Sequence, residues 1–178
     1  PPDLAAEAHA AIGAPVFNLY GPTEAAVDVT CQRFETGPEE LTGPHPAGVP
    51  IGVPISNVTA LVLNPDTLEV APTGAVGELY LGGIQLADGY RGRPDLTAAA
   101  FLPNPHAAAP GERLYRTGDL VRRKADGVLD YLGRADAQIK VRGQRIEPGE
   151  IEAALTEHPA IMAAAVKAWP GPDGQLRL

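Results

Sequence analysis

Cysteine is nearly absent from this sequence, because Cys31 is the only one, so no disulfide can form within the chain. Long apolar runs are also missing, and a membrane-spanning helix needs about 20 consecutive apolar residues. The first residues, PPDLAAEAHAA, lack the basic start and the apolar run of a signal peptide. Together these absences favour a cytoplasmic protein without a membrane segment.

Basic side chains are scarce, with 14 Lys and Arg against 22 Asp and Glu, which gives a formal net charge of −8. Binding to nucleic acid depends on a basic face that neutralises phosphates. The composition therefore argues against a nucleic-acid partner. The histidines do not indicate a metal site, because they are scattered without the close spacing that zinc requires, at His9, His45, His106 and His158.

Glycine and proline are abundant, with 20 and 19 residues among 178. Both counts exceed average usage, which favours many turns and short strands over long helices. The length fits one domain or two small ones. The chain does not begin with Met, and its last residues, QLRL, resemble the start of a strand. We therefore expect a piece of a larger protein, incomplete at both ends.

The patterns predict an α+β fold. A helix is expected over residues 3–12, with Asp3 as its N-cap and Gly13 just past its end. The Pro- and Gly-rich residues 36–54 are expected to be loop, and the ADG turn predicts a hairpin. Further helices are expected at 95–101 and 148–157, and strands at 16–19, 27–34, 58–63, 75–81, 119–124, 128–132, 138–141 and 163–168.

A change in composition near residues 134–138 predicts a domain boundary. The chain before it is rich in strands and glycine, whereas the chain after it has a compact strand, helix, strand pattern. We therefore expect one domain over residues 1–135 and a second, mobile one over 136–178.

The stretch NLYGPTE is the first candidate site. Its Gly-Pro turn restricts the backbone and sets Thr23 beside Glu24. A hydroxyl can donate to a phosphate, and a carboxylate can bind Mg²⁺, which proteins hold with one or two carboxylates plus phosphate oxygens. The alternative is an ordinary turn in which Thr23 caps the backbone and Glu24 lies in solvent.

Two further stretches carry polar groups that could bind a nucleotide. In YRTGDL, Gly118 turns the chain and Asp119 is expected to open a strand, where a carboxylate could accept from the diol of a ribose. An ordinary turn aspartate is the alternative. The stretch YLGRADAQIKVRGQRIEPGE concentrates positive charge at Arg134, Lys140, Arg142 and Arg145. This charge suits an anionic ligand such as a phosphate or a phosphopantetheine arm. The alternative is a solvated strand face with alternating charges.

The order of these motifs closely resembles the adenylation domains of nonribosomal peptide synthetases, in the adenylate-forming superfamily. NLYGPTE is followed by GELYLGGIQLADGYRGRPDLTAAAF, YRTGDL and YLGRADAQIKVRGQRIEPGEIE. The resemblance covers nearly the whole chain. It implies the β-rich last part of the large N-terminal domain, followed by the start of a small α+β subdomain.

The resemblance implies that this chain binds ATP and Mg²⁺. Tyr20 would border the adenine, and Gly21 would let the backbone approach it. Thr23 would contact the phosphates, and Glu24 would ligate Mg²⁺. The remaining contacts are implied at Asp119 on the ribose hydroxyls, Tyr131 beside the base and Arg134 near the ribose and phosphates.

The small subdomain would move between two steps of the reaction. Asp136 matches the hinge, and Lys140, with the strand through Gly143 and Arg145, would face the active site when the thioester forms. A carboxylate first attacks the α-phosphate of ATP, which gives an aminoacyl-adenylate and pyrophosphate. The phosphopantetheine thiol of a peptidyl carrier domain then attacks the acyl carbon.

Three positions around the first motif match acyl-pocket residues of the family, namely Leu19, Val27 and Asp28. This combination resembles serine-selecting domains, and an ornithine-like side chain is the second choice. Other parts of the family's site do not occur in this chain: the Gly-rich phosphate loop, the aspartate for the substrate amine and the C-terminal lysine. We therefore expect the isolated chain to be inactive.

Two alternatives stay open. The chain could be a non-catalytic module that binds a small MbtH-like helper protein, whose docking surface is expected at residues 96–110, LTAAAFLPNPHAAAP. It could also belong to an acyl-CoA ligase, in which free CoA accepts the acyl group.

Overall fold

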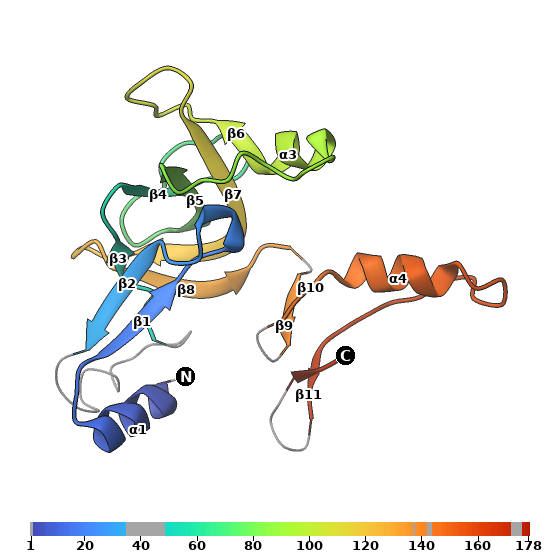
Figure 1. Cartoon of the computed structure of the whole chain (residues 1–178), viewed down its shortest axis with the longest axis horizontal. Coiled ribbons are helices and arrows are strands. Elements are labelled where there is room, and N and C mark those ends of the chain that lie inside the picture. The colour runs from blue at the N-terminus through green and yellow to red at the C-terminus, as the bar shows by residue number, and fades with distance from the viewer. Residues whose placement is uncertain (1, 35–48, 137, 142–143, 172–175) are drawn as a thin grey trace. The chain divides into compact units, whose positions relative to one another are not determined.

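The computed structural model describes residues 2–34, 49–136, 138–141, 144–171 and 176–178 (Figure 1). The chain separates into two compact units, Pro1–Gly133 and Arg134–Leu178. Both are described below by themselves. Strands outnumber helices, and the fold is α+β as the sequence predicts. Most of the loop expected at 36–54 falls outside the described residues, and the motion expected about Asp136 stays a prediction.

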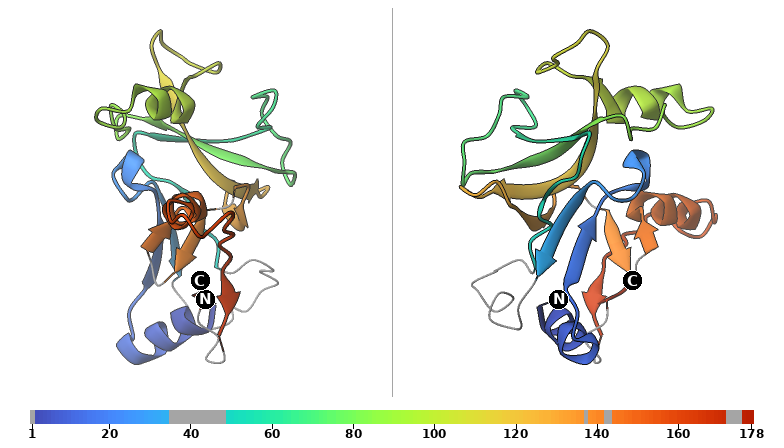
Figure 2. Two further views of the ribbon diagram at one scale, coloured as in Figure 1. Left: turned by 90° about the vertical axis from the view of Figure 1, so that its right-hand side faces the viewer. Right: turned by 60° about the vertical axis from the view of Figure 1, so that its left-hand side comes forward.

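The first unit begins with a helix and a small antiparallel sheet. Helix α1 (Pro2–Ile12) leads into β1 (Val16–Tyr20), which pairs with β2 (Thr30–Phe34), and β2 pairs with β3 (Val53–Pro54). The register sets Tyr20 opposite Thr30 at one end of the hairpin. The two strands run side by side as the blue arrows of Figure 2. The motif NLYGPTE therefore lies at the end where β1 leaves this sheet.

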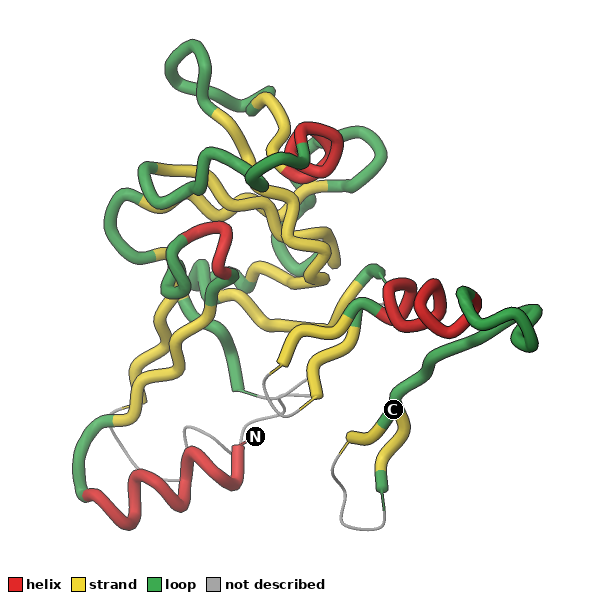
Figure 3. Tube along the Cα trace, turned by 45° about the vertical axis from the view of Figure 1, so that its right-hand side comes forward, coloured by secondary structure: helices red, strands yellow, loops and turns green. Residues whose placement is uncertain are grey.

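A second, five-stranded sheet makes up most of the first unit. Its order is β4-β5-β7-β6, and β8 also pairs with β7. The strands are β4 (Val58–Leu63), β5 (Val76–Gly83), β6 (Phe101–Pro103), β7 (Arg113–Arg123) and β8 (Leu129–Arg134), with helix α3 (Pro94–Ala100) before β6. Figure 3 shows the yellow strands of this sheet curving along their length. Strand β5 pairs with β4 and β7, and β6 with β7, all in antiparallel fashion.

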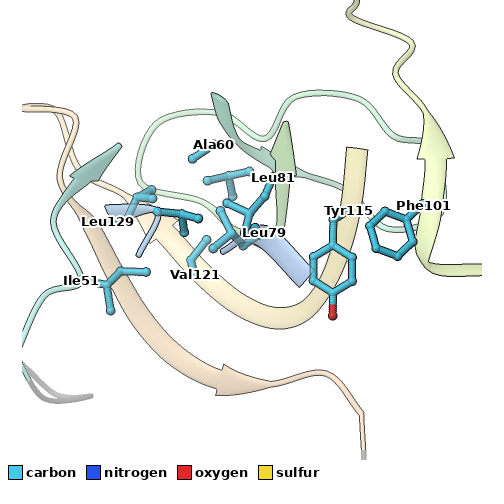
Figure 4. Close-up of a cluster of buried hydrophobic side chains, with 11 residues drawn as sticks. Ile51, Ala60, Leu79, Leu81, Phe101, Tyr115, Val121 and Leu129 are labelled. Carbon is cyan, nitrogen blue, oxygen red and sulfur yellow. The ribbon is translucent and has the colours of Figure 1, made fainter. Parts of the chain in front are cut away.

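The core of the first unit lies against this curved sheet. Leu79, Val121 and Leu129 have no exposed surface, and Figure 4 shows their side chains gathered in the concavity of β7. Six of the eight residues of strand β5 are buried, and its sequence is a nearly continuous apolar run that only Glu78 interrupts. Ala25 and Val29, from the turn after β1, belong to the same cluster. The core therefore joins the NLYGPTE turn to the large sheet.

The second unit is smaller. Strands β9 (Ile139–Val141) and β10 (Gln144–Ile146) pair before helix α4 (Pro148–Thr156), and β11 (Trp169–Pro170) pairs with β12 (Leu176–Arg177). Pro148 occupies the first turn of α4, where its missing N–H costs nothing. Within the described part of the chain, no helix is both long and apolar enough to cross a membrane.

Several predicted elements are wrong in their bounds. Asp3 lies inside α1 and is not its N-cap. The strand expected at 27–34 begins only at Thr30, because Ala26 and Val27 adopt the left-handed conformation. Residues 163–168 do not form a strand; the pairing starts at Trp169, beyond this alanine-rich stretch. Strand β3 lies within the segment expected to be loop.

Gly52 and Gly127 provide a matched test of packing in the first unit. Their φ values are nearly equal, at +84° and +87°, but a Cβ on Gly52 would lie 2.0 Å from the carbonyl oxygen of Cys31, whereas a Cβ on Gly127 meets no atom within 4 Å. We expect Gly52→Ala to destabilise the unit by about 3 kcal/mol and Gly127→Ala by about 1 kcal/mol. Urea unfolding of both variants in a complete domain checks this, and equal losses would contradict it.

Candidate functional site

The turn after β1 closes on itself through backbone hydrogen bonds. A short 3₁₀ helix, η1 (Thr23–Ala25), follows Pro22, whose carbonyl accepts from the Ala25 and Val27 N–H groups at 3.1 and 3.0 Å. The Val29 N–H donates to the Tyr20 carbonyl at 2.8 Å. These bonds hold Thr23 and Glu24 in one conformation. The Gly-Pro pair thus begins a short helical turn rather than a plain connector.

Gly21 is required by the turn itself. A Cβ at this position would lie 2.1 Å from the Val27 carbonyl oxygen, which is too close for any side chain. Val27 has a φ of +74°, an uncommon conformation for a β-branched residue. Backbone strain of this kind concentrates at functional sites. The approach of adenine to Gly21 stays a prediction, because internal packing already accounts for this glycine.

Glu24 is held from two directions by the segment after β5. It is only 8% exposed, so the alternative in which it lies in solvent is wrong. Its backbone carbonyl accepts from the Ala87 N–H at 2.8 Å, and its Oε1 accepts from the Tyr90 hydroxyl at 2.6 Å. Burial, followed by the bond to Glu24, raises the pKa of Tyr90, which therefore stays a neutral donor. Thr23 beside it is exposed.

The surroundings of Glu24 fit a magnesium ion that is shared with a phosphate ligand. Among residues that the structure describes, no group of three or more His, Cys, Asp or Glu could hold a metal ion. Mg²⁺ usually keeps several waters and takes one or two carboxylates plus substrate oxygens. The single carboxylate of Glu24 matches that donor set, and the exposed Thr23 hydroxyl beside it is available to a phosphate.

Asp119 lies in the middle of β7, and the prediction that it opens a strand is wrong. The pairing of β7 with β5 shifts between Glu78↔Leu120 and Tyr80↔Arg116, so the strand bulges at this point. Gly118 occupies the bulge with a φ of +75°. Asp119 is 3% exposed, and its Oδ2 accepts a hydrogen bond from the Tyr20 hydroxyl.

The Tyr20–Asp119 bond joins two motifs that lie 99 residues apart in the sequence. Burial, followed by the charge of Asp119, raises the pKa of Tyr20, so the phenol donates and the carboxylate accepts. The Tyr131 ring lies 6.4 Å from the Tyr20 ring between centroids, at 41°. The fold therefore gathers Tyr20, Asp119 and Tyr131 into one group.

Arg134 and Asp136, at the start of the second unit, form an ion pair with each other. The Arg134 guanidinium donates twice to the Asp136 carboxylate, at 2.7 and 2.6 Å, and Asp136 Oδ1 also accepts from the Gln138 N–H. Lys140 lies in β9 opposite Arg145 of β10. The side chains of Lys140 and Arg145 are outside what the structure describes, as are residues 142 and 143. Their predicted roles remain predictions.

The three predicted pocket residues are exposed on the β1 turn and the strand before it. Leu19 and Val27 are 51% and 58% exposed, and Asp28 is exposed as well. Leu19 shares its face of β1 with Phe17, by the alternation of the strand. Exposed apolar side chains and a carboxylate are therefore available on this part of the chain.

Sequence reasoning missed two side chains that support the site, Tyr90 and Glu78. Tyr90 binds Glu24 across 66 positions, a contact that no local pattern indicates. Glu78 has no exposed surface, and Arg116 pairs with it at 2.9 Å. A glutamate inside the apolar run VGELYLGG was the available signal, because a buried charge needs a partner.

Comparison with known proteins places the chain in a family. The family model described as AMP-binding enzyme matches residues 1–91 of the 178. Enterobactin synthase component F of Escherichia coli K12 is 49% identical over 168 residues, which is 94% of this chain and 13% of that protein. Phosphinothricin tripeptide synthetase PhsB of Streptomyces viridochromogenes is 52% identical over 85% of this chain and 12% of its own length.

Solved structures share this fold. The Vibrio cholerae adenylation domain AlmE, in complex with glycyl-adenosine-5′-phosphate, matches 98% of this chain with a TM-score of 0.79 and 37% identity. An artificially fused adenylation-PCP di-domain, NpsA-ThdA from Klebsiella oxytoca, matches 99% with a TM-score of 0.81 and 29% identity. This chain spans about a third of each of those two structures. The chain belongs to the AMP-binding enzyme family, as a part of an adenylation domain of the nonribosomal peptide synthetase type.

Proposed function

We propose that the domain containing this chain activates an amino acid with ATP. The substrate carboxylate attacks the α-phosphorus, the bond to the β-phosphate oxygen breaks, and aminoacyl-AMP and pyrophosphate form. The observation that carries this proposal is the bond between Tyr20 and Asp119, which brings a ring and a buried carboxylate to one place. An aromatic face and a diol acceptor side by side suit the base and ribose of a nucleotide.

The protein contributes mainly position and charge. Tyr20 and Tyr131 border the adenine, Gly21 lies in the turn beneath it, and Asp119 accepts from the ribose hydroxyls. Thr23 donates to the phosphates. Glu24 would hold Mg²⁺, which would supply positive charge for the leaving pyrophosphate, and the Tyr90 hydroxyl fixes the Glu24 carboxylate. The consumption of ATP agrees with the predicted cytoplasmic location.

The second step transfers the acyl group to a thiol. The phosphopantetheine of a peptidyl carrier domain attacks the acyl carbon, and AMP leaves. The similarity to an adenylation-PCP fusion supports a carrier domain as the partner. We assign Asp136 as the hinge of the small subdomain, Arg134 to the ribose and phosphate region, and Lys140 to the active site in the thioester-forming state.

Serine is the proposed amino acid, and an ornithine-like side chain is the second choice. The support is the match of Leu19, Val27 and Asp28 to acyl-pocket positions of the family, together with the exposure of all three, since a carboxylate there can accept from a hydroxyl or pair with an amine. We expect pyrophosphate exchange, measured on a complete domain with all twenty amino acids and ornithine, to peak with serine. Asp28→Ala should lower exchange with serine about tenfold, by the loss of one hydrogen bond to a charged group.

The same assay separates the alternatives. Glu69→Gln is a control, because this exposed carboxylate accepts from the nearby Thr67 hydroxyl and lies outside the candidate site. A peak with another amino acid would keep the activity and reject the pocket assignment. Transfer to free CoA, with no transfer to a carrier protein, would identify an acyl-CoA ligase. No exchange in a folded protein would reject amino-acid activation.

Binding of an MbtH-like helper is a second candidate function. A surface hollow of about 420 Å³ lies over the predicted segment, next to exposed Pro103 and Pro110. Such a hollow can receive an aromatic side chain of a partner. Titration of a purified helper against the complete domain, with and without ATP, tests the proposal. Binding without any nucleotide affinity in the domain would favour the non-catalytic module.

A further inference from the structure

Glu78 is a buried carboxylate without a predicted role. It comes from the middle of β5 and has no exposed surface. Arg116 of the neighbouring strand β7 pairs with it, with its Nε 2.9 and 3.2 Å from the two carboxylate oxygens and its Nη2 3.0 Å from Oε2. The Arg116 side chain is 46% exposed, so only one partner of this ion pair is withdrawn from water.

An ion pair of this kind is weak support for stability alone. Removing a carboxylate from water costs several kcal/mol, and apolar residues of similar volume often replace a buried pair without loss. Glu78 also has a backbone partner that an apolar residue could not serve. Its Oε1 also accepts from the Gly118 backbone N–H at 3.0 Å. The carboxylate therefore binds the backbone of the bulge as well as Arg116.

The bulge interrupts the regular register between β7 and β5. Between the pairs Glu78↔Leu120 and Tyr80↔Arg116, three residues of β7 lie opposite Leu79 alone. The Gly118 N–H is satisfied by Glu78, and the Asp119 N–H donates to the Thr117 hydroxyl at 3.0 Å. That hydroxyl donates in turn to the Leu79 carbonyl at 2.7 Å. Side-chain oxygens therefore accept from both N–H groups, as suits residues that a bulge takes out of register.

We infer that Glu78 is a positioning residue of the nucleotide site, which holds the bulge of β7 so that the Asp119 carboxylate faces the ligand diol. The inference rests on the proposed function, because Asp119 must bind ribose for its direction to matter. Glu78 itself is not assigned a contact with the ligand. It acts through Gly118, one residue before Asp119, and Arg116 neutralises its charge.

The ribose hydroxyls provide a readout that general destabilisation would not change. We would measure the dissociation constants of ATP and of 2′,3′-dideoxy-ATP by calorimetry on the complete domain. The wild type should prefer ATP by about tenfold or more, from hydrogen bonds to a charged acceptor. Glu78→Gln should reduce this preference to about threefold or less, because an amide cannot accept from both Arg116 and Gly118 through two oxygens.

Glu69→Gln is the matched control, since it removes the same charge from an exposed position of the first unit and should keep the wild-type preference. If the wild type prefers ATP and Glu78→Gln keeps that preference in full, the inference is wrong. If the wild type itself does not prefer ATP, the ribose assignment of Asp119 fails instead. If Glu78→Gln does not fold, the preference for ATP over 2′,3′-dideoxy-ATP is measured in Arg116→Lys instead. Lysine keeps the charge but loses the paired contacts with Glu78, so the preference should fall in this variant as well.

Discussion

Asp119→Ala should weaken ATP binding by about 100-fold, because two hydrogen bonds from the ribose hydroxyls to a charged acceptor are lost. The same substitution removes the acceptor of the buried Tyr20 hydroxyl. Exchange of pyrophosphate should fall at least as far as binding, whereas the affinity for the amino acid should stay near that of the wild type. Calorimetric titration of ATP into the complete domain measures the effect.

Two variants separate the ribose contact from damage to the sheet. Asp119→Asn keeps an oxygen for Tyr20 but loses the charge, so we expect a loss of about tenfold. Asp130→Ala removes another sheet aspartate, which pairs with Arg122 at 3.0 Å and lies outside the candidate site. That control should bind ATP normally. Equal losses in Asp119→Ala and Asp130→Ala would contradict the assignment of Asp119.

Glu24→Gln should make ATP binding nearly independent of Mg²⁺ and lower the exchange rate by about 100-fold, because an amide is a poor ligand for a hard cation and the pyrophosphate charge is then less stabilised. The first effect is measured by titrating ATP in excess Mg²⁺ and in a chelator. The wild type should bind more tightly with the metal. The second effect is measured by pyrophosphate exchange at saturating substrates.

Tyr90→Phe is the informative companion to this variant. It removes the hydroxyl that donates to Glu24 at 2.6 Å but leaves the carboxylate in place. We expect it to raise the Mg²⁺ concentration required for half-maximal exchange, with little change in the rate at saturating metal. If Glu24→Gln retains the full metal dependence of the wild type, Glu24 is not the magnesium ligand and the role proposed for this turn is wrong.

Local signals predicted part of the fold well. Strand β4 has the bounds that its apolar pattern gives, Val58–Leu63, and the ADG turn does form a hairpin between β7 and β8. The errors arise where distant residues decide the conformation. Val27 has high β propensity, yet it adopts a φ of +74° in the turn, where its carbonyl lies against Gly21, and β2 begins only at Thr30. Residues 163–168 are apolar enough for a strand but do not pair as one.

In the candidate site, too, sequence motifs predicted some residues and distant contacts determined the others. Motif order predicted Tyr20, Glu24 and Asp119 as site residues, and the fold brings Tyr20 to Asp119. The groups that hold them, Tyr90 and Glu78, come from β5 and the segment after it, and they act through contacts that span 66 and 40 positions. Sequence patterns report local periodicity, so such contacts cannot be predicted from them.

The group formed by Tyr20, Asp119 and Tyr131 is proposed to receive the nucleotide. A crystal structure of the complete domain with a non-hydrolysable seryl-adenylate analogue would test this proposal most directly. We expect ribose oxygens within hydrogen-bonding distance of the Asp119 carboxylate and the adenine against Tyr20 and Tyr131. An analogue bound away from Asp119, with the Tyr20–Asp119 bond intact, would contradict the proposal.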